Sequence, residues 1–67
     1  MMMYAYEVYL DGKLVDESNY EYESISEAKS EAGFAVGTYA DCYDRDWWEF
    51  RVVIRSEEGV VSDESYH

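Results

Sequence analysis

The sequence has little of what small secreted domains and enzymes usually contain. It has one cysteine, Cys42, so no intramolecular disulfide can form, although small secreted domains commonly depend on one. Its one histidine, His67, is the last residue, where a side chain is poorly placed to act as a general base. No basic stretch followed by an apolar run marks a signal peptide, and no apolar segment approaches the ~20 residues that cross a bilayer. We therefore expect a cytoplasmic protein without a membrane anchor.

Motifs for catalysis and ligand binding are also missing. The sequence has no glycine-rich phosphate loop, no Ser/His/Asp set and no Cys/His metal spacing. Cys42 stands among acidic residues, which disfavour a reactive thiolate. Asp41, Asp44 and Asp46 carry oxygen ligands, but they lack the central glycine and terminal glutamate of a calcium loop. We predict a protein that is not an enzyme and uses no cofactor or metal, with a metal or metabolite sensor at the three aspartates as an alternative.

Aliphatic core residues are scarce, since Leu, Ile, Val and Phe make up only 13 of the 67 residues. A share below ~20% combined with high net charge is typical of disordered chains. Eight tyrosines and two tryptophans offset this scarcity, because such rings bury ~150–250 Å² each and keep a polar atom near water. We therefore predict a single folded domain over residues 1–67, with a core that relies on tyrosine.

Positive charge is scarce as well. Five Lys and Arg stand against sixteen Asp and Glu, which gives a net charge of -11. Such a charge repels nucleic acid and anionic membranes, and it attracts basic protein surfaces. The expected partner is therefore a basic protein, without direct contact to nucleic acid or membrane.

The order of secondary structure follows from the residue patterns. Residues 4–10 alternate as in a half-buried strand, and Asp11-Gly12 is typical of a hairpin turn. A second strand is expected from Leu14 to Glu23, where tyrosines alternate with glutamates. The capping box at residues 24–27 predicts the start of a helix. Its apolar face is expected to consist of Ile25, Ala28, Ala32, Val36, Tyr39 and Tyr43.

The helix end stays open between Gly37 and Tyr43, because each glycine in a helix costs ~1 kcal/mol relative to alanine. Alternation from Trp47 to Arg55 predicts the strongest strand, and a turn and a short strand from Val60 to about Asp63 follow. The order ββαββ with short connections predicts an α+β fold. We expect a four-stranded antiparallel sheet with one helix packed on one face.

Carboxylates gather at the predicted outer positions of this sheet, at Glu7, Glu21, Glu23 and Glu49. Neighbouring positions on a sheet lie ~5–7 Å apart, similar to the spacing of charges along DNA. Exposed aromatic residues would anchor a partner there. The residues predicted to bind the partner are Glu7, Tyr9, Glu21, Glu23, Asp44, Asp46, Trp47 and Glu49. A surface that only keeps the protein soluble fits the same pattern, and Arg51 and Arg55 interrupt its negative charge.

The junction from Glu23 to Lys29 and the pair Trp47-Trp48 that opens the second hairpin resemble the layout of small phage-encoded inhibitors of bacterial defence, above all anti-CRISPR proteins and other acidic DNA mimics. The resemblance covers the order of elements over most of the chain and transfers no functional residue. It implies an inhibitor in the host cytoplasm that binds a basic DNA-binding surface of a CRISPR-Cas or related DNA-handling enzyme and blocks access of DNA. Inhibition by mimicry and by conformational locking both stay open.

A second interpretation is a small accessory or structural interaction module. Such a module would associate through exposed aromatic residues, or as a homodimer through an edge strand. The sequence leaves open whether the protein is a monomer or a homodimer.

Overall fold

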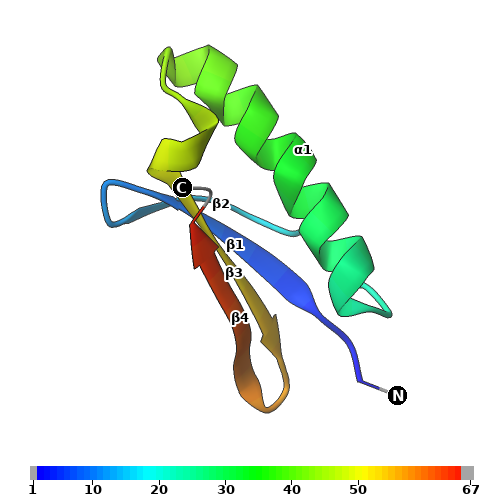
Figure 1. Ribbon diagram of the computed structural model, residues 1–67. Coiled ribbons are helices and arrows are strands. Elements are labelled where there is room, and N and C mark those ends of the chain that lie inside the picture. Colours follow the sequence, from blue (N-terminus) through cyan, green and yellow to red (C-terminus); the bar gives the residue numbers. More distant parts are fainter. Residues whose placement is uncertain (1, 66–67) are drawn as a thin grey trace.

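The protein consists of one sheet covered on one face by one long helix (Figure 1). The computed structural model describes residues 2–65. The strands are antiparallel in the order β2-β1-β3-β4, so the predicted ββαββ fold is confirmed. In chain order the elements are β1 (Ala5–Leu10), β2 (Lys13–Glu17), α1 (Ile25–Tyr43), the 3-10 helix η1 (Trp47–Glu49), β3 (Phe50–Ser56) and β4 (Gly59–Ser65).

The core lies between α1 and the two central strands. Alternation along β1 turns Val8 and Leu10 toward the helix, where they pair with Val52 and Phe50 of β3. The helix contributes mainly alanine to the contact, which lets its backbone approach the sheet. The buried cluster consists of Val8, Leu10, Tyr22, Ala28, Ala32, Val36, Phe50, Val52 and Ile54. Other tyrosines pack around this cluster, namely Tyr4, Tyr6 and Tyr39.

The hairpin turn forms as predicted. Asp11 and Gly12 both have positive φ, at 54° and 79°, which matches the tight turn that Asp-Gly favours. The second strand, however, ends at Glu17, so its predicted extension to Glu23 is wrong. The Ser18 hydroxyl accepts a hydrogen bond from the Tyr6 amide at 3.1 Å, and the Ser18 amide donates to the Tyr6 carbonyl at 3.0 Å. After these bonds the chain leaves the sheet edge to reach the helix.

Tyr22 alone returns to the sheet from this connection. Its amide and carbonyl pair with those of Tyr4 at 2.7 and 2.8 Å, and its side chain is buried. Glu21 and Glu23 on either side of it are exposed and belong to no strand. The expected alternation of tyrosine and glutamate therefore reduces to one anchoring residue.

Helix α1 begins as the capping box predicts and continues beyond Gly37 to Tyr43. The Ser24 hydroxyl accepts from the Glu27 amide at 3.1 Å. Past Gly37 the helix still packs apolar side chains against the core, which offsets the low helix propensity of glycine. It ends at Asp44, whose φ of 53° lets the Arg45 amide donate to the Ala40 carbonyl at 2.9 Å.

The strand predicted from Trp47 begins only at Phe50. Residues 47–49 form η1 instead, because the Glu49 carboxylate accepts a hydrogen bond from the Asp46 amide at 2.9 Å and closes a helical turn. Trp48 is consequently exposed, whereas the alternating pattern of the predicted strand would have turned it inward with Phe50 and Val52. Strand β4 is longer than expected and runs to Ser65, and His67 lies outside the described residues.

The left-handed backbone of Asp44 generates a prediction about stability. A non-glycine residue at positive φ is strained, and a carboxylate at a helix C-terminus opposes the helix dipole. We expect Asp44→Gly to raise the free energy of unfolding by about 1 kcal/mol, and the melting temperature by about 4–8 °C. Asp44→Ala removes the charge but keeps the strain, so thermal denaturation should show a smaller gain. Equal gains in both variants would contradict the role of the backbone.

Candidate functional site

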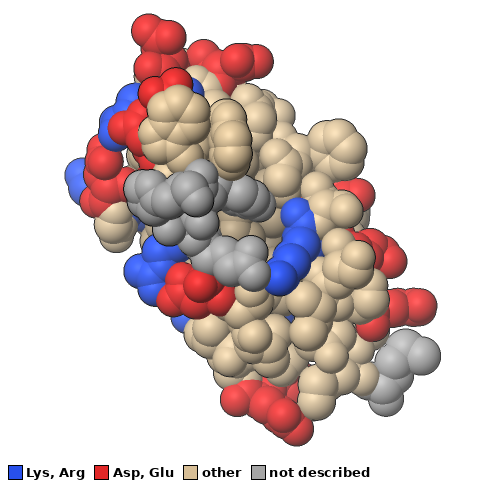
Figure 2. All heavy atoms as spheres, in the orientation of Figure 1, with Lys and Arg blue, Asp and Glu red and all other residues tan. Residues whose placement is uncertain are grey.

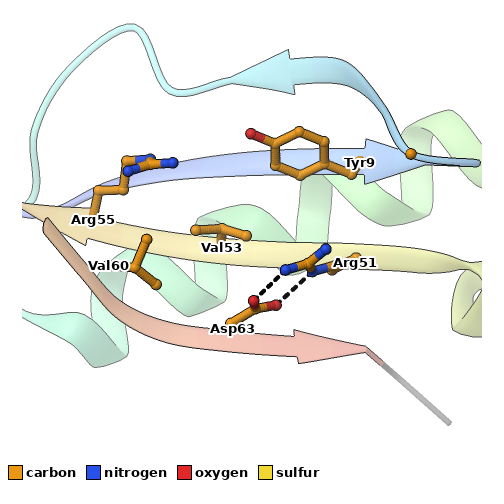
Figure 3. Close-up of a pocket in the computed structure, with 7 residues that line it drawn as sticks. Tyr9, Arg51, Val53, Arg55, Val60 and Asp63 are labelled. Carbon is orange, nitrogen blue, oxygen red and sulfur yellow. Dashed lines mark hydrogen bonds and ion pairs between the residues drawn. The ribbon is translucent and has the colours of Figure 1, made fainter.

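The face of the sheet turned away from α1 carries a shallow cavity of about 310 Å³ (Figure 3). Val53 forms its floor and is only 4% exposed, because longer side chains on both sides cover it. The strand register brings Glu7 of β1 and Asp63 of β4 opposite Val53. The lining residues are Tyr9, Gly12, Arg51, Val53, Arg55, Val60 and Asp63.

Ion pairs balance the charges on this face. Arg55 Nε donates to Glu7 Oε1 at 2.7 Å, and the Tyr9 hydroxyl donates to the same oxygen at 3.0 Å. The Arg51 guanidinium makes two hydrogen bonds to the Asp63 carboxylate, which lowers the pKa of Asp63 (Figure 3). Each arginine that lines the cavity is therefore matched with a carboxylate of the same face.

The acidic sheet face that the sequence predicts is not formed. Of the four glutamates expected there, only Glu7 lies on the open face, and it is paired with Arg55. Glu21 and Glu23 lie in the connection between β2 and α1, and Glu49 lies in η1. The sequence missed this because alternation marks the face of a residue only where the chain is a strand.

The remaining predicted site residues lie mostly at one end of the molecule. Asp44 caps α1, Asp46 precedes η1, and Trp47 and Glu49 belong to η1, so the fold keeps these four near one another. Tyr9 is half-buried on the open face of the sheet. The eight residues predicted from sequence thus divide among the sheet face, the β2–α1 connection and the C-terminal end of the helix.

Arg45 holds that end of the molecule together. Its guanidinium donates to both carboxylate oxygens of Asp11 at 3.0 and 3.1 Å, and to Glu49 Oε1 at 2.7 Å. The hydrogen bond from Arg45, followed by that from the Asp46 amide, lowers the pKa of Glu49. The bonds of Arg45 join the β1–β2 turn to η1, and they use the positive charge of Arg45 within the protein.

A second group of carboxylates lies on the β2 side of α1, and only Glu21 and Glu23 of this group were predicted from the sequence to bind a partner. An oxygen of the Asp16 carboxylate lies 3.5 Å from the Tyr6 hydroxyl. The pKa of Tyr6 is raised to about 12, first by burial of its side chain and next by the negative charge of Asp16. The negative charge of Glu31 also contributes to that rise. The pKa of the neighbouring Tyr22 is raised as well, first by burial and then by charges that include those of Glu31 and Glu27. We call the carboxylates of this region the acidic flank, which consists of Asp16, Glu27 and Glu31 beside these tyrosines and of Glu21 and Glu23, the sequence neighbours of Tyr22. For Glu27 and Glu31, the signal in the sequence was their spacing of one helical turn.

The opposite flank of α1, toward β4, carries fewer carboxylates and is hollow. A groove of about 430 Å³ runs between the helix and η1, and we call it the glycine groove. On the side of the molecule shown in Figure 2, carboxylates gather at the ends and edges, whereas neutral side chains occupy much of the middle. The groove is lined by Gly33, Val36, Gly37, Ala40, Asp41 and Trp47.

Within residues 2–65, no group of three or more His, Cys, Asp or Glu side chains is placed to hold a metal ion. Asp41, Asp44 and Asp46 accordingly do not converge on one point. No helix in the described part of the chain has the length and hydropathy that a membrane-spanning helix needs.

Comparisons of this chain with protein-family models, with curated proteins and with solved structures find no match. Its function is therefore inferred from its own residues.

The tyrosines beside the acidic flank predict how stability depends on pH. The folded pKa of Tyr6 is about 12, against an ordinary value of 10.0, so between these pH values the unfolded chain releases a proton that the folded chain keeps. Stability is therefore full below pH 10 and is lost as the pH rises toward 12. Tyr22 and Tyr39, whose pKa values are also raised, act in the same direction.

We expect Tyr6→Phe to lose less free energy of unfolding than the wild type between pH 9 and pH 11.5, a range set by these pKa values. Urea denaturation at a series of pH values measures the difference, whatever the stability of the variant at neutral pH. An identical pH dependence in both proteins would show that Tyr6 is not the titrating group.

Proposed function

We propose that the protein is a non-enzymatic inhibitor that binds a basic DNA-binding surface of a CRISPR-Cas or related DNA-handling enzyme in the host cytoplasm, and blocks access of DNA. The observation that carries the proposal is the net charge of -11 together with the way the arginines are used. Arg45, Arg51 and Arg55 are each held in ion pairs with carboxylates of the same chain. These pairs concentrate the excess negative charge on other surfaces.

The acidic flank is the surface that supports this proposal best. Glu27 and Glu31 lie one turn apart on α1, about 6 Å along the helix axis, which is close to two steps of 3.4 Å along a DNA strand. Glu21 and Glu23 extend the negative charge beyond the start of the helix. A rigid helix and its capped start thus present carboxylates at intervals that a basic DNA-binding groove can accept.

Electrostatic attraction is expected to act mainly on the rate of association. Opposite charges on two surfaces steer the encounter, and salt screens that effect over a Debye length of about 10 Å at 0.1 M. The complex should therefore form quickly at low salt and weaken as salt is added.

Neutralising the acidic flank tests the proposal. Glu23→Gln combined with Glu31→Gln should weaken the protein's competition with duplex DNA for a purified guide-loaded Cas nuclease by about tenfold or more, because two exposed charges of the site are lost. Binding is measured by DNA displacement and by inhibition of cleavage, at low and high salt and across several Cas effectors and other basic DNA-binding enzymes.

The matched control is Glu57→Gln combined with Glu58→Gln, in the exposed turn between β3 and β4. It changes the net charge by the same amount, so it should leave competition almost unchanged if the acidic flank is the site. Equal weakening by both pairs would point to net charge alone. Failure to displace DNA from any enzyme tested would overturn the proposed function.

Exposed aromatic side chains favour the second candidate, an interaction module that forms a homodimer. Trp47, Trp48 and Phe34 are 52%, 43% and 73% exposed, and large aromatic residues often dominate binding energy. Like charges of -11 on each copy oppose self-association at low salt. Sedimentation at low and high salt distinguishes the candidates, because the module should be a dimer at high salt and the proposed inhibitor a monomer at both.

A further inference from the structure

The glycine groove combines a flat wall with an aromatic edge. Gly33 and Gly37 lie one turn apart on the β4 side of α1, and a Cβ built at either position would meet no atom within 4 Å. Trp47 borders the same space from η1 and is about half exposed. The groove is thus open to solvent, and its two walls come from α1 and η1, which contact each other.

The position of α1 explains why nothing from residues 2–65 fills this space. The helix packs mainly on β1 and β3, the two central strands, and β4 lies beyond them at the sheet edge (Figure 1). Glycine at positions 33 and 37 costs ~1 kcal/mol of helix stability each relative to alanine. Since both positions have room for a side chain, packing within the described chain does not require glycine there.

Aromatic residues around the glycine groove are suited to anchor a partner. The indole rings of Trp47 and Trp48 meet edge to face, with centroids 5.8 Å apart, and both are partly exposed. Tryptophan at the border of a desolvated pocket is among the commonest sources of binding energy at interfaces. A groove of about 430 Å³ falls in the range of ~300–1,000 Å³ that is typical of ligand pockets, so it can receive large apolar side chains.

Charge around the groove indicates the chemistry of the occupant. Asp41 belongs to its lining, and Asp44 and Asp46 follow where the helix ends and its dipole is negative. Lys29 lies on the same flank two turns before Gly37, so the negative charge is concentrated at the Asp41 end. A second copy of this chain also has a net charge of -11, so the carboxylates at the Asp41 end would repel it. The same carboxylates would attract a basic segment.

We propose that the glycine groove binds an apolar side chain from a basic, amphipathic helical segment of the partner protein, whose lysines or arginines meet the carboxylates at the Asp41 end. This inference rests on the proposed function, in which the partner surface is basic. The glycine groove adds a defined anchor to the acidic binding surface of this protein. The acidic residues attract the partner, and the groove holds one of the partner's apolar side chains.

A synthetic helix of leucine and lysine, about 18 residues long with leucines on one face, is the probe. Calorimetry and the fluorescence of Trp47 and Trp48 report its binding to the full-length protein. Gly37→Leu places a side chain in the groove, at a position where an added Cβ meets no atom within 4 Å, and should weaken binding by about tenfold. Thr38→Leu adds the same side chain one position later, outside the groove, and should bind as the wild type does.

Each outcome decides between the interpretations. Equal affinity of the wild type and Gly37→Leu would overturn the inference, as would equal affinity for a control peptide with serine in place of leucine. In the second case attraction by charge, and with it the proposed function, would still stand. If neither lysine peptide bound at low salt, the proposed function would fail as well. A wild-type dimer that Gly37→Leu converts to a monomer would identify a second copy as the occupant.

Discussion

The packing of α1 on the β1–β3 pair determines where every other part of the protein lies. Residues from the two ends of the chain meet there, since Val8 pairs with Val52 and Leu10 with Phe50, and the alanines of α1 cover both pairs. Because this core is narrow, the helix covers the central strands and leaves the edge strands β2 and β4 on either side of it. The acidic flank and the glycine groove are the surfaces beside these edges.

Features encoded by neighbouring residues could be predicted from the sequence. The Asp11-Gly12 turn, the Ser24 cap and the alternation of β1 each depend on residues within a few positions, and all three are confirmed. The end of β2 and the turn at η1 could not be predicted, because one depends on Ser18 bonding to Tyr6 in another strand and the other on a carboxylate bonding to a backbone amide. In both segments these hydrogen bonds stabilise a structure other than the strand that the alternating pattern predicts.

The candidate site was less predictable because surface charge depends on contacts between distant residues. Glu7 and Arg55 are 48 positions apart, and Asp11 and Arg45 are 34 apart, yet each pair is joined by hydrogen bonds. The net charge of the sequence therefore predicted the sign of the surface charge but not which surface carries it. The structure replaces an acidic sheet face with a balanced one, and places Glu27 and Glu31 beside buried tyrosines.

The two flanks of α1 divide the tasks that binding a basic protein requires. The acidic flank offers charge along the β2 side, and the glycine groove offers apolar contact along the β4 side. One flat partner surface cannot cover both flanks of a helix that projects from the sheet. The groove carries negative charge of its own where the helix ends, since Asp41 lines it and Asp44 caps α1 three residues later. A partner anchored in the groove would therefore be oriented by this end of the helix, so that its basic residues lie beyond the C-terminus of α1.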